Sequence, residues 1–285
     1  MVAVGIGLVV LGASAFAVND GLSKRLAVDF HVVQVLWARF AFFFLPMLIV
    51  IGPHRWLKIA RTDRPSLQIA RACAPLLAGA LIIYGLKLLP LTDVTAILFM
   101  TPLLVTALSI PILGERVTAS GWIAVVAGFI GVLVIVRPGA GVLAWAALLP
   151  LGTATLAALL QIATRLLKTA NPLTTLFYTG LVGTVAMTLM LPFVWQSPSL
   201  EGWALLVILG LLHGAGHLCW ILAFARAPAS TLAPFGYTQL IAAAIFGFIV
   251  FDEVPDATTL FGAGIIAAAG LFVLRTQVRQ PPRTS

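Results

Sequence analysis

Apolar stretches long enough to cross a lipid bilayer fill this chain almost from end to end. A hydrocarbon core about 30 Å thick needs about 20 apolar helical residues for each crossing. The composition fits such a chain, since 61% of the residues are hydrophobic, 9% are charged and the mean hydropathy is +1.10. These values exclude a water-soluble domain, so any function must lie among packed helices. Ten spans are expected, at residues 3–23, 32–51, 70–88, 91–113, 119–136, 142–164, 173–195, 203–225, 229–251 and 257–274.

The positive charges between these spans favour one orientation. Cytoplasmic loops of membrane proteins carry an excess of Lys and Arg. If the N-terminus is cytoplasmic, 12 of the 17 Lys and Arg residues, including Arg71 at the start of the third span, fall on the cytoplasmic side, and only Lys24, Arg25, Lys87 and Arg137 fall outside. The remaining one, Arg39, lies within a span. We therefore predict a multi-pass protein of the cell (inner) membrane with both termini in the cytoplasm. Attraction to the anionic inner leaflet then explains the net charge of +8 without a nucleic-acid partner.

The chain also repeats its own pattern. A shift of 138 positions lays Pro228 on Pro90 and Glu253 on Glu115, within the same order of helix, short acidic loop and Gly-rich helix. Two halves of five spans follow, and because five is odd they must cross the membrane in opposite senses, which is the inverted-repeat design of secondary transporters. We expect an all-α integral membrane protein whose ten helices form two inverted five-helix repeats around a central cavity. The expected divisions are residues 1–137, residues 142–275 and a cytoplasmic tail at 276–285.

Several motifs carry a family resemblance. Pro90 opens the fourth span, Pro102 lies within it, the loop 113–118 reads Leu-Gly-Glu-Arg-Val-Thr, and a Gly-rich span follows, with a looser copy around residues 251–253. This pattern resembles the drug/metabolite transporter superfamily, and more narrowly its ten-helix EamA-type members, which include bacterial amino-acid and metabolite exporters. The resemblance implies a cavity lined mainly by the first, third, fourth, sixth, eighth and ninth helices, with the fifth and tenth at the periphery. Phe251-Asp252-Glu253 replaces Leu113-Gly114-Glu115 in the second copy, so the outer turn is expected to differ in shape.

An intramembrane ion pair is expected between the first two spans. Asp20 lies near the outer end of the first span, and Arg39 lies about 10 Å below the outer end of the second, at about 1.5 Å rise per residue. Lys24 is a second candidate partner, because it lies four residues beyond Asp20 on the same helix. A structural salt bridge is one interpretation, and substrate contact or proton coupling by Asp20 is the other.

The eighth span places imidazoles and aromatic rings on one face. His213, His217, Trp220 and Phe224 recur at helical spacing, which favours a substrate-binding face. A structural histidine pair is the alternative, while a zinc site lacks a third ligand. Other polar or aromatic residues within spans are further candidate pocket residues, although each alone is equally explained as packing or an interhelical hydrogen bond. They are Asn19, Tyr84, Met100, Gln161, Tyr237 and Gln239.

Prolines indicate where the helices bend. Pro102 and Pro111 interrupt the fourth span and Pro234 the ninth, and Pro102 and Pro234 are candidate hinges, with a static kink as the alternative. Small residues at spacings of four in the fifth and tenth spans permit close helix contact, within one chain or in a weak homodimer.

The motifs that other function classes need are missing from the sequence. There is no G-x-S-x-G, no H-E-x-x-H and no phosphate-binding glycine loop, so neither an enzyme nor a direct use of ATP is indicated. Cys73 and Cys219 lie within spans and indicate neither a disulfide nor a metal. We therefore predict a secondary transporter without a cofactor, either a monomer or a weak homodimer, which exports amino acids or similar small metabolites. Uptake or exchange of a metabolite or nucleoside-like solute is the alternative.

Overall fold

The computed structural model describes residues 2–46, 56–113, 119–137, 145–166, 172–227, 232 and 235–278. Over these residues the fold is all helical, as predicted, and no β-strand occurs. Five helices are long and apolar enough to cross a membrane, and five shorter apolar helices accompany them in the described part of the chain. The helices are α1 (Val2–Asp29), α2 (Val32–Ala41), α4 (Trp56–Ala60), α5 (Pro65–Leu88), α6 (Leu91–Leu98), α7 (Thr101–Leu113), α8 (Ala119–Val136), α10 (Leu148–Leu166), α11 (Pro172–Met190), α12 (Leu200–Phe224), α14 (Thr238–Phe251) and α15 (Ala257–Val278), with a short 3-10 helix η2 (Leu191–Phe193).

The fourth span is broken into α6 and α7. The break falls at Phe99 and Met100, because Pro102 has no N–H to donate to the carbonyl of Leu98. The hydroxyl of Thr101 donates to that carbonyl instead, at 2.7 Å. Pro111, which was also expected to interrupt this span, lies inside α7 without ending it. The candidate hinge Pro234 lies outside the described residues.

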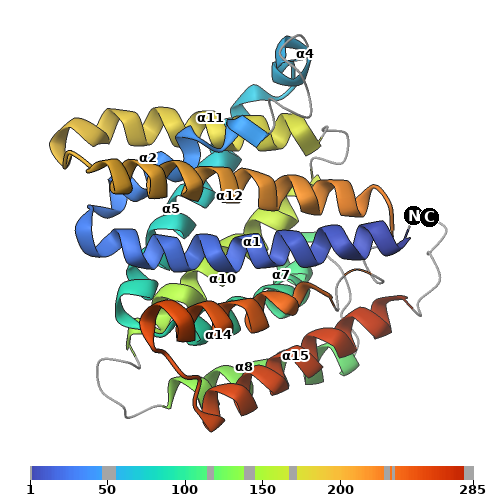
Figure 1. The fold of residues 1–285 in the computed structure, drawn as a ribbon. Coiled ribbons are helices and arrows are strands. Elements are labelled where there is room, and N and C mark those ends of the chain that lie inside the picture. The colour runs from blue at the N-terminus through green and yellow to red at the C-terminus, as the bar shows by residue number, and fades with distance from the viewer. Residues whose placement is uncertain are drawn as a thin grey trace.

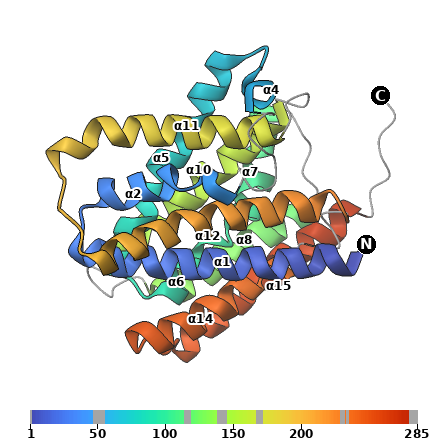
Figure 2. The ribbon, with the colours of Figure 1, turned by 45° about the horizontal axis from the view of Figure 1, so that its top comes forward.

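The helices lie roughly side by side in one bundle (Figure 1). α1 packs along α12 and α14, α2 packs on α11 and α12, and α5 packs on α10 and α11. In both views α11 lies at one edge of the bundle and α14 with α15 lies at the opposite edge (Figure 2). The beginning of α1 and the end of α15 lie on the same side of the bundle, as an even number of crossings requires.

Small residues set the closest helix contact at the periphery. α8 packs on α15 along the edge of the bundle (Figure 1). A β-carbon on Gly131 would lie 2.8 Å from the carbonyl oxygen of Gly262, and one on Gly262 would lie 2.6 Å from that of Gly131. These glycines therefore serve a contact within the chain.

Candidate functional site

A buried arginine joins three helices near the middle of the bundle. Arg39 lies on α2 and is 8% exposed. Its Nη2 donates to Asp20 Oδ1 on α1 at 3.3 Å, and its Nε donates to His213 Nδ1 on α12 at 3.1 Å. Because His213 Nδ1 accepts this bond, it carries no proton, so the ring holds its proton on Nε2. The cation is thus held by one carboxylate and one imidazole.

The histidines of α12 lie beside this arginine because glycines bring α12 close to α2. A β-carbon on Gly210 would lie 2.6 Å from the carbonyl oxygen of Ala38, and one on Gly214 would collide with the carbonyl oxygen of Phe43. The rings of His213 and His217 meet edge to face, with their centroids 4.8 Å apart. Backbone contact between α2 and α12 therefore aligns Arg39 with both imidazoles.

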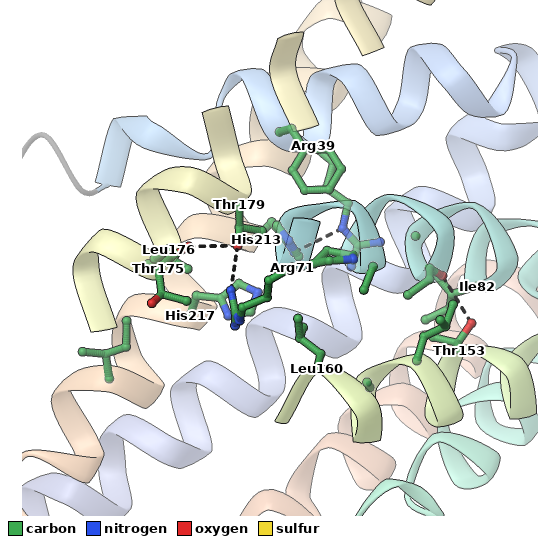
Figure 3. A pocket seen from close by; sticks show the side chains of 18 residues that line it. Arg39, Arg71, Ile82, Thr153, Leu160, Thr175, Leu176, Thr179, His213 and His217 are labelled. Carbon is green, nitrogen blue, oxygen red and sulfur yellow. Dashed lines mark hydrogen bonds between the residues drawn. The ribbon is translucent and has the colours of Figure 1, made fainter. Parts of the chain in front are cut away.

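A pocket of about 580 Å³ opens on this group. Its lining comes from five helices, α2, α5, α10, α11 and α12, and Figure 3 shows Arg39, His213 and His217 among its walls. The resemblance implied walls from six spans. The third, sixth and eighth of these correspond to α5, α10 and α12 and do line this pocket. The described residues of the first, fourth and ninth spans do not. α1 packs tightly on α12 and α14, and α6 on α14, whereas α2 and α11 complete the walls of this pocket.

Each of the five helices contributes a polar side chain to the pocket, and the rest of the lining is apolar. Arg71 on α5 lines it and donates from Nη1 to Thr179 Oγ1 on α11 at 3.3 Å (Figure 3). Thr153 on α10 donates to the carbonyl of Ala78 at 3.2 Å, which ties α10 to α5. No Asp or Glu is among the described lining residues. In the described ranges, no group of three His, Cys, Asp or Glu residues could hold a metal ion.

Of the candidate residues named from the sequence, Arg39, His213 and His217 line this pocket, and the others do not. Trp220 packs instead in the cluster of Val9, Ala223 and Leu232, between α1 and α12. Asn19 is fully buried and donates to the carbonyl of Leu209 at 2.6 Å.

The remaining candidate pocket residues are not among the residues that line this pocket. Tyr237 stacks on Phe99, with ring centroids 4.5 Å apart. Gln239 is half-buried in α14, and Met100 is fully buried at the break between α6 and α7. Tyr84 and Gln161 are exposed.

Arg71, Thr175 and Thr179 also line the pocket, although none of them was predicted from the sequence. Arg71 was assigned to a cytoplasmic segment, yet α5 begins at Pro65, six residues earlier, so Arg71 lies inside the helix. Proline is frequent in the first turn of a helix, so Pro65 was the signal that could have placed Arg71 correctly.

A second polar group, which we call the Glu253 cluster, lies at one end of the bundle. It consists of Lys24, Asp93, Arg137, Glu253 and Asp256. Glu253 pairs with Lys24 and accepts from the backbone N–H of Leu91 at 2.9 Å. Lys24, the second candidate partner for Asp20, instead makes this contact and donates to the carbonyl of Leu89 at 2.8 Å. The cluster therefore links α1 and the start of α6 to the turn between α14 and α15.

Asp256 completes this cluster at the start of α15. It accepts from the backbone N–H of Thr259 at 2.8 Å and pairs with Arg137. The bond from Thr259, with those from Thr258 and Arg137, holds the pKa of Asp256 below its ordinary value. Thr259 Oγ1 in turn donates to Asp93 Oδ1 on α6 at 2.9 Å.

Comparison with known proteins identifies the family of this chain. The sequence model of the EamA-like transporter family matches residues 3–137 and matches again at residues 143–275. The chain belongs to the EamA-like transporter family. It is therefore a membrane protein and a transporter rather than an enzyme, and it falls within the drug/metabolite transporter superfamily, as the resemblance predicted.

Relatives within this family differ in what they carry. The chain is 30% identical to the S-adenosylmethionine uptake transporter of Rickettsia bellii, over 96% of this chain and 94% of that one. It is 29% identical to the riboflavin transporter of Rhizobium johnstonii, over 95% and 91%. It is 25% identical to the pseudopaline exporter of Pseudomonas aeruginosa, over 96% of each chain. A crystal structure of a protein 16% identical in sequence covers 98% of each chain with a TM-score of 0.60, which supports the fold alone.

Proposed function

We propose that this EamA-family protein is a secondary transporter of the cell membrane that carries a small organic metabolite by alternating access. The observation that carries the proposal is the pocket at Arg39, which lies in the membrane-spanning bundle while the Glu253 cluster bridges one end of it. A site within the bundle, exposed to one side at a time, is what alternating access requires.

The arrangement of helix contacts supports two related halves. If the five spans of one half correspond in order to the five of the other, α1 corresponds to α10 and α12 to α5. The contact of α1 with α12 is then matched by that of α10 with α5, and the contact of α2 with α12 by that of α11 with α5. The family model also matches each half separately. Halves that pack in this reciprocal way can exchange roles between two states of similar energy.

The relatives suggest which solutes to test first. Four proteins that are 30% identical to this chain are named S-adenosylmethionine uptake transporters. Others are named for riboflavin and for pseudopaline export, so membership of the family does not set the direction. None of these names supports amino-acid export, which we keep as the alternative because the pocket combines imidazoles, guanidinium groups and apolar walls.

Counterflow in proteoliposomes tests the proposed function. With S-adenosylmethionine, riboflavin and a panel of amino acids, we expect exchange of at least one solute, with and without an imposed pH gradient. Ala157→Trp should abolish this exchange, because Ala157 lines the pocket and the indole would fill it. Leu159→Trp on the same helix is the matched control, since Leu159 is exposed and its replacement should leave exchange intact. Equal activity of the two variants would remove this pocket from the transport path.

The membrane orientation can be checked by labelling exposed serines. The distribution of Lys and Arg predicts that Ser66 faces the cytoplasm and Ser197 the outside. In a background with Cys73 and Cys219 replaced, an impermeant thiol reagent added to intact cells should label Ser197→Cys and spare Ser66→Cys. The reverse pattern would place both termini outside.

The Glu253 cluster should control access from the outside. Glu253→Gln removes the charge that holds Lys24 and weakens acceptance from Leu91, so the closed end should open more often. Ile82 lines the pocket, and Ile82→Cys should then react with an outside thiol reagent several-fold faster in the Glu253→Gln background. Glu201→Gln is the control, because Glu201 lies at the start of α12 outside the Glu253 cluster. An unchanged rate with Glu253→Gln would show that the cluster does not limit access.

A further inference from the structure

The pocket contains a buried donor that its protein neighbours leave unused. Arg39 Nη1 is buried and has no hydrogen-bond partner, although Nε and Nη2 of the same group are occupied by His213 and Asp20. A buried charged donor without an acceptor costs about 1–3 kcal/mol or more. Because Arg39 lines the pocket, an acceptor entering the pocket is the group that could satisfy Nη1.

A second guanidinium lines the same space. Arg71 enters from α5 and is held by its bond to Thr179 (Figure 3). Arginine keeps its charge under all ordinary conditions and presents a planar set of donors that matches the two oxygens of a carboxylate. The guanidinium groups of Arg39 and Arg71 and the imidazoles of His213 and His217 line the pocket, and no carboxylate is among its described lining residues. Asp20 contacts Arg39 from α1, which does not line the pocket.

The rest of the pocket fits the body of a small organic molecule. Its remaining walls are mostly apolar, and its volume of about 580 Å³ falls within the range of about 300–1,000 Å³ usual for small-molecule sites. A phosphate would bring up to two negative charges, whereas Asp20 already pairs with Arg39. A single carboxylate on an apolar body matches both the charge and the lining. The apolar lining residues are Phe40, Ala74, Pro75, Ala78, Gly79, Ile82, Leu156, Ala157, Leu160, Leu176 and Ile221.

We propose that this pocket binds organic carboxylates, with Arg39 Nη1 and the guanidinium of Arg71 holding the carboxylate and the walls of α5 and α10 holding the apolar body. This assignment of substrate class rests on the proposed transport function. It predicts that the protein distinguishes an acid from the amide of the same shape, because an amide accepts a hydrogen bond but brings no charge.

Calorimetric titration of the full chain in nanodiscs tests the proposal with three probes, 3-phenylpropionate, 3-phenylpropionamide and phenyl phosphate. The acid should bind at least about tenfold more tightly than the amide, as expected for charge-assisted hydrogen bonds. Arg71→Gln and the double variant Asp20→Asn with Arg39→Gln should each reduce that preference, and the double variant keeps the site free of an unpaired charge so that it can fold. Arg25→Gln should retain the full preference, since Arg25 pairs with Asp29 at the exposed end of α1.

Equal binding of acid and amide, or no binding of either at millimolar concentration, would overturn the carboxylate assignment. Tighter binding of phenyl phosphate than of 3-phenylpropionate would overturn it in favour of a phosphate ligand. Binding is measured without transport, so the two proposals fail separately. If the acid is preferred while no solute exchanges in proteoliposomes, the transport proposal fails and the site remains. If solutes exchange and the preference is absent, only the carboxylate site fails.

Discussion

Removing one partner of the Asp20 and Arg39 pair should damage the protein more than removing both. Arg39→Gln leaves a buried carboxylate without its cation, and Asp20→Asn leaves a buried guanidinium without its anion. Breaking a buried pair in this way typically costs about 3–5 kcal/mol, whereas replacing both charges together is far milder. We expect each single variant to lose most of its monodisperse yield and to unfold at a lower temperature, and the double neutral variant to recover part of both.

Arg25→Gln provides the matched control for this cycle, because its pair with Asp29 is exposed and such pairs contribute about 0–1 kcal/mol. A double variant no more stable than the single ones would show that the two charges are not coupled. If Asp20→Asn folds normally and abolishes only the dependence of transport on a pH gradient, Asp20 is a proton carrier and not a structural partner.

Gly214→Ala should be the most damaging single methyl addition in the bundle. The new β-carbon would meet the backbone oxygen of Phe43, which cannot rotate away, so α12 must move from the turn that follows α2. Overpacking against such an obstacle costs about 3 kcal/mol, more than the gain of up to about 1 kcal/mol from the better helix propensity of alanine. Because His213 adjoins this contact, the shift should also disrupt its bond to Arg39 and reduce transport.

Gly7→Ala and Gly264→Ala are the controls, since a β-carbon at either position meets no atom within 4 Å. Both should unfold at or slightly above the temperature of the original protein, measured by the same thermal scan. If Gly214→Ala behaves like them, α2 and α12 are not in the close contact described above.

The all-helical fold and its apolar helices followed from the sequence because membrane spans have a strong signal in hydropathy. The matching depths of Asp20 and Arg39 were also visible there, and the structure has the two side chains 3.3 Å apart. The sequence could not tell which neighbour each helix face meets. Trp220 shares α12 with His213 and His217, yet it turns toward α1 rather than toward the pocket.

Contacts between distant segments were the least predictable. Lys24 has an acid four residues away on its own helix, but it pairs with Glu253, 229 positions along the chain. Local spacing favours the nearer acid, and only the packing of the turn after α14 against the end of α1 brings the farther one within reach. Arg71 was misplaced for a different reason, because the helix begins before the apolar stretch does.

The charged cluster at Arg39 has no counterpart under the twofold repeat that we propose for the chain. The shift of 138 positions expected to relate the two halves carries Asp20 to Ala158, Arg39 to Phe177 and His213 back to Pro75, all of them without charge. The proposed repeat would therefore duplicate the helices but not the charged group, which occurs once. A solute with one charged and one apolar end would fit such a pocket in one orientation, with its charged head toward Arg39 on α2 and Arg71 on α5, whichever side of the membrane it came from.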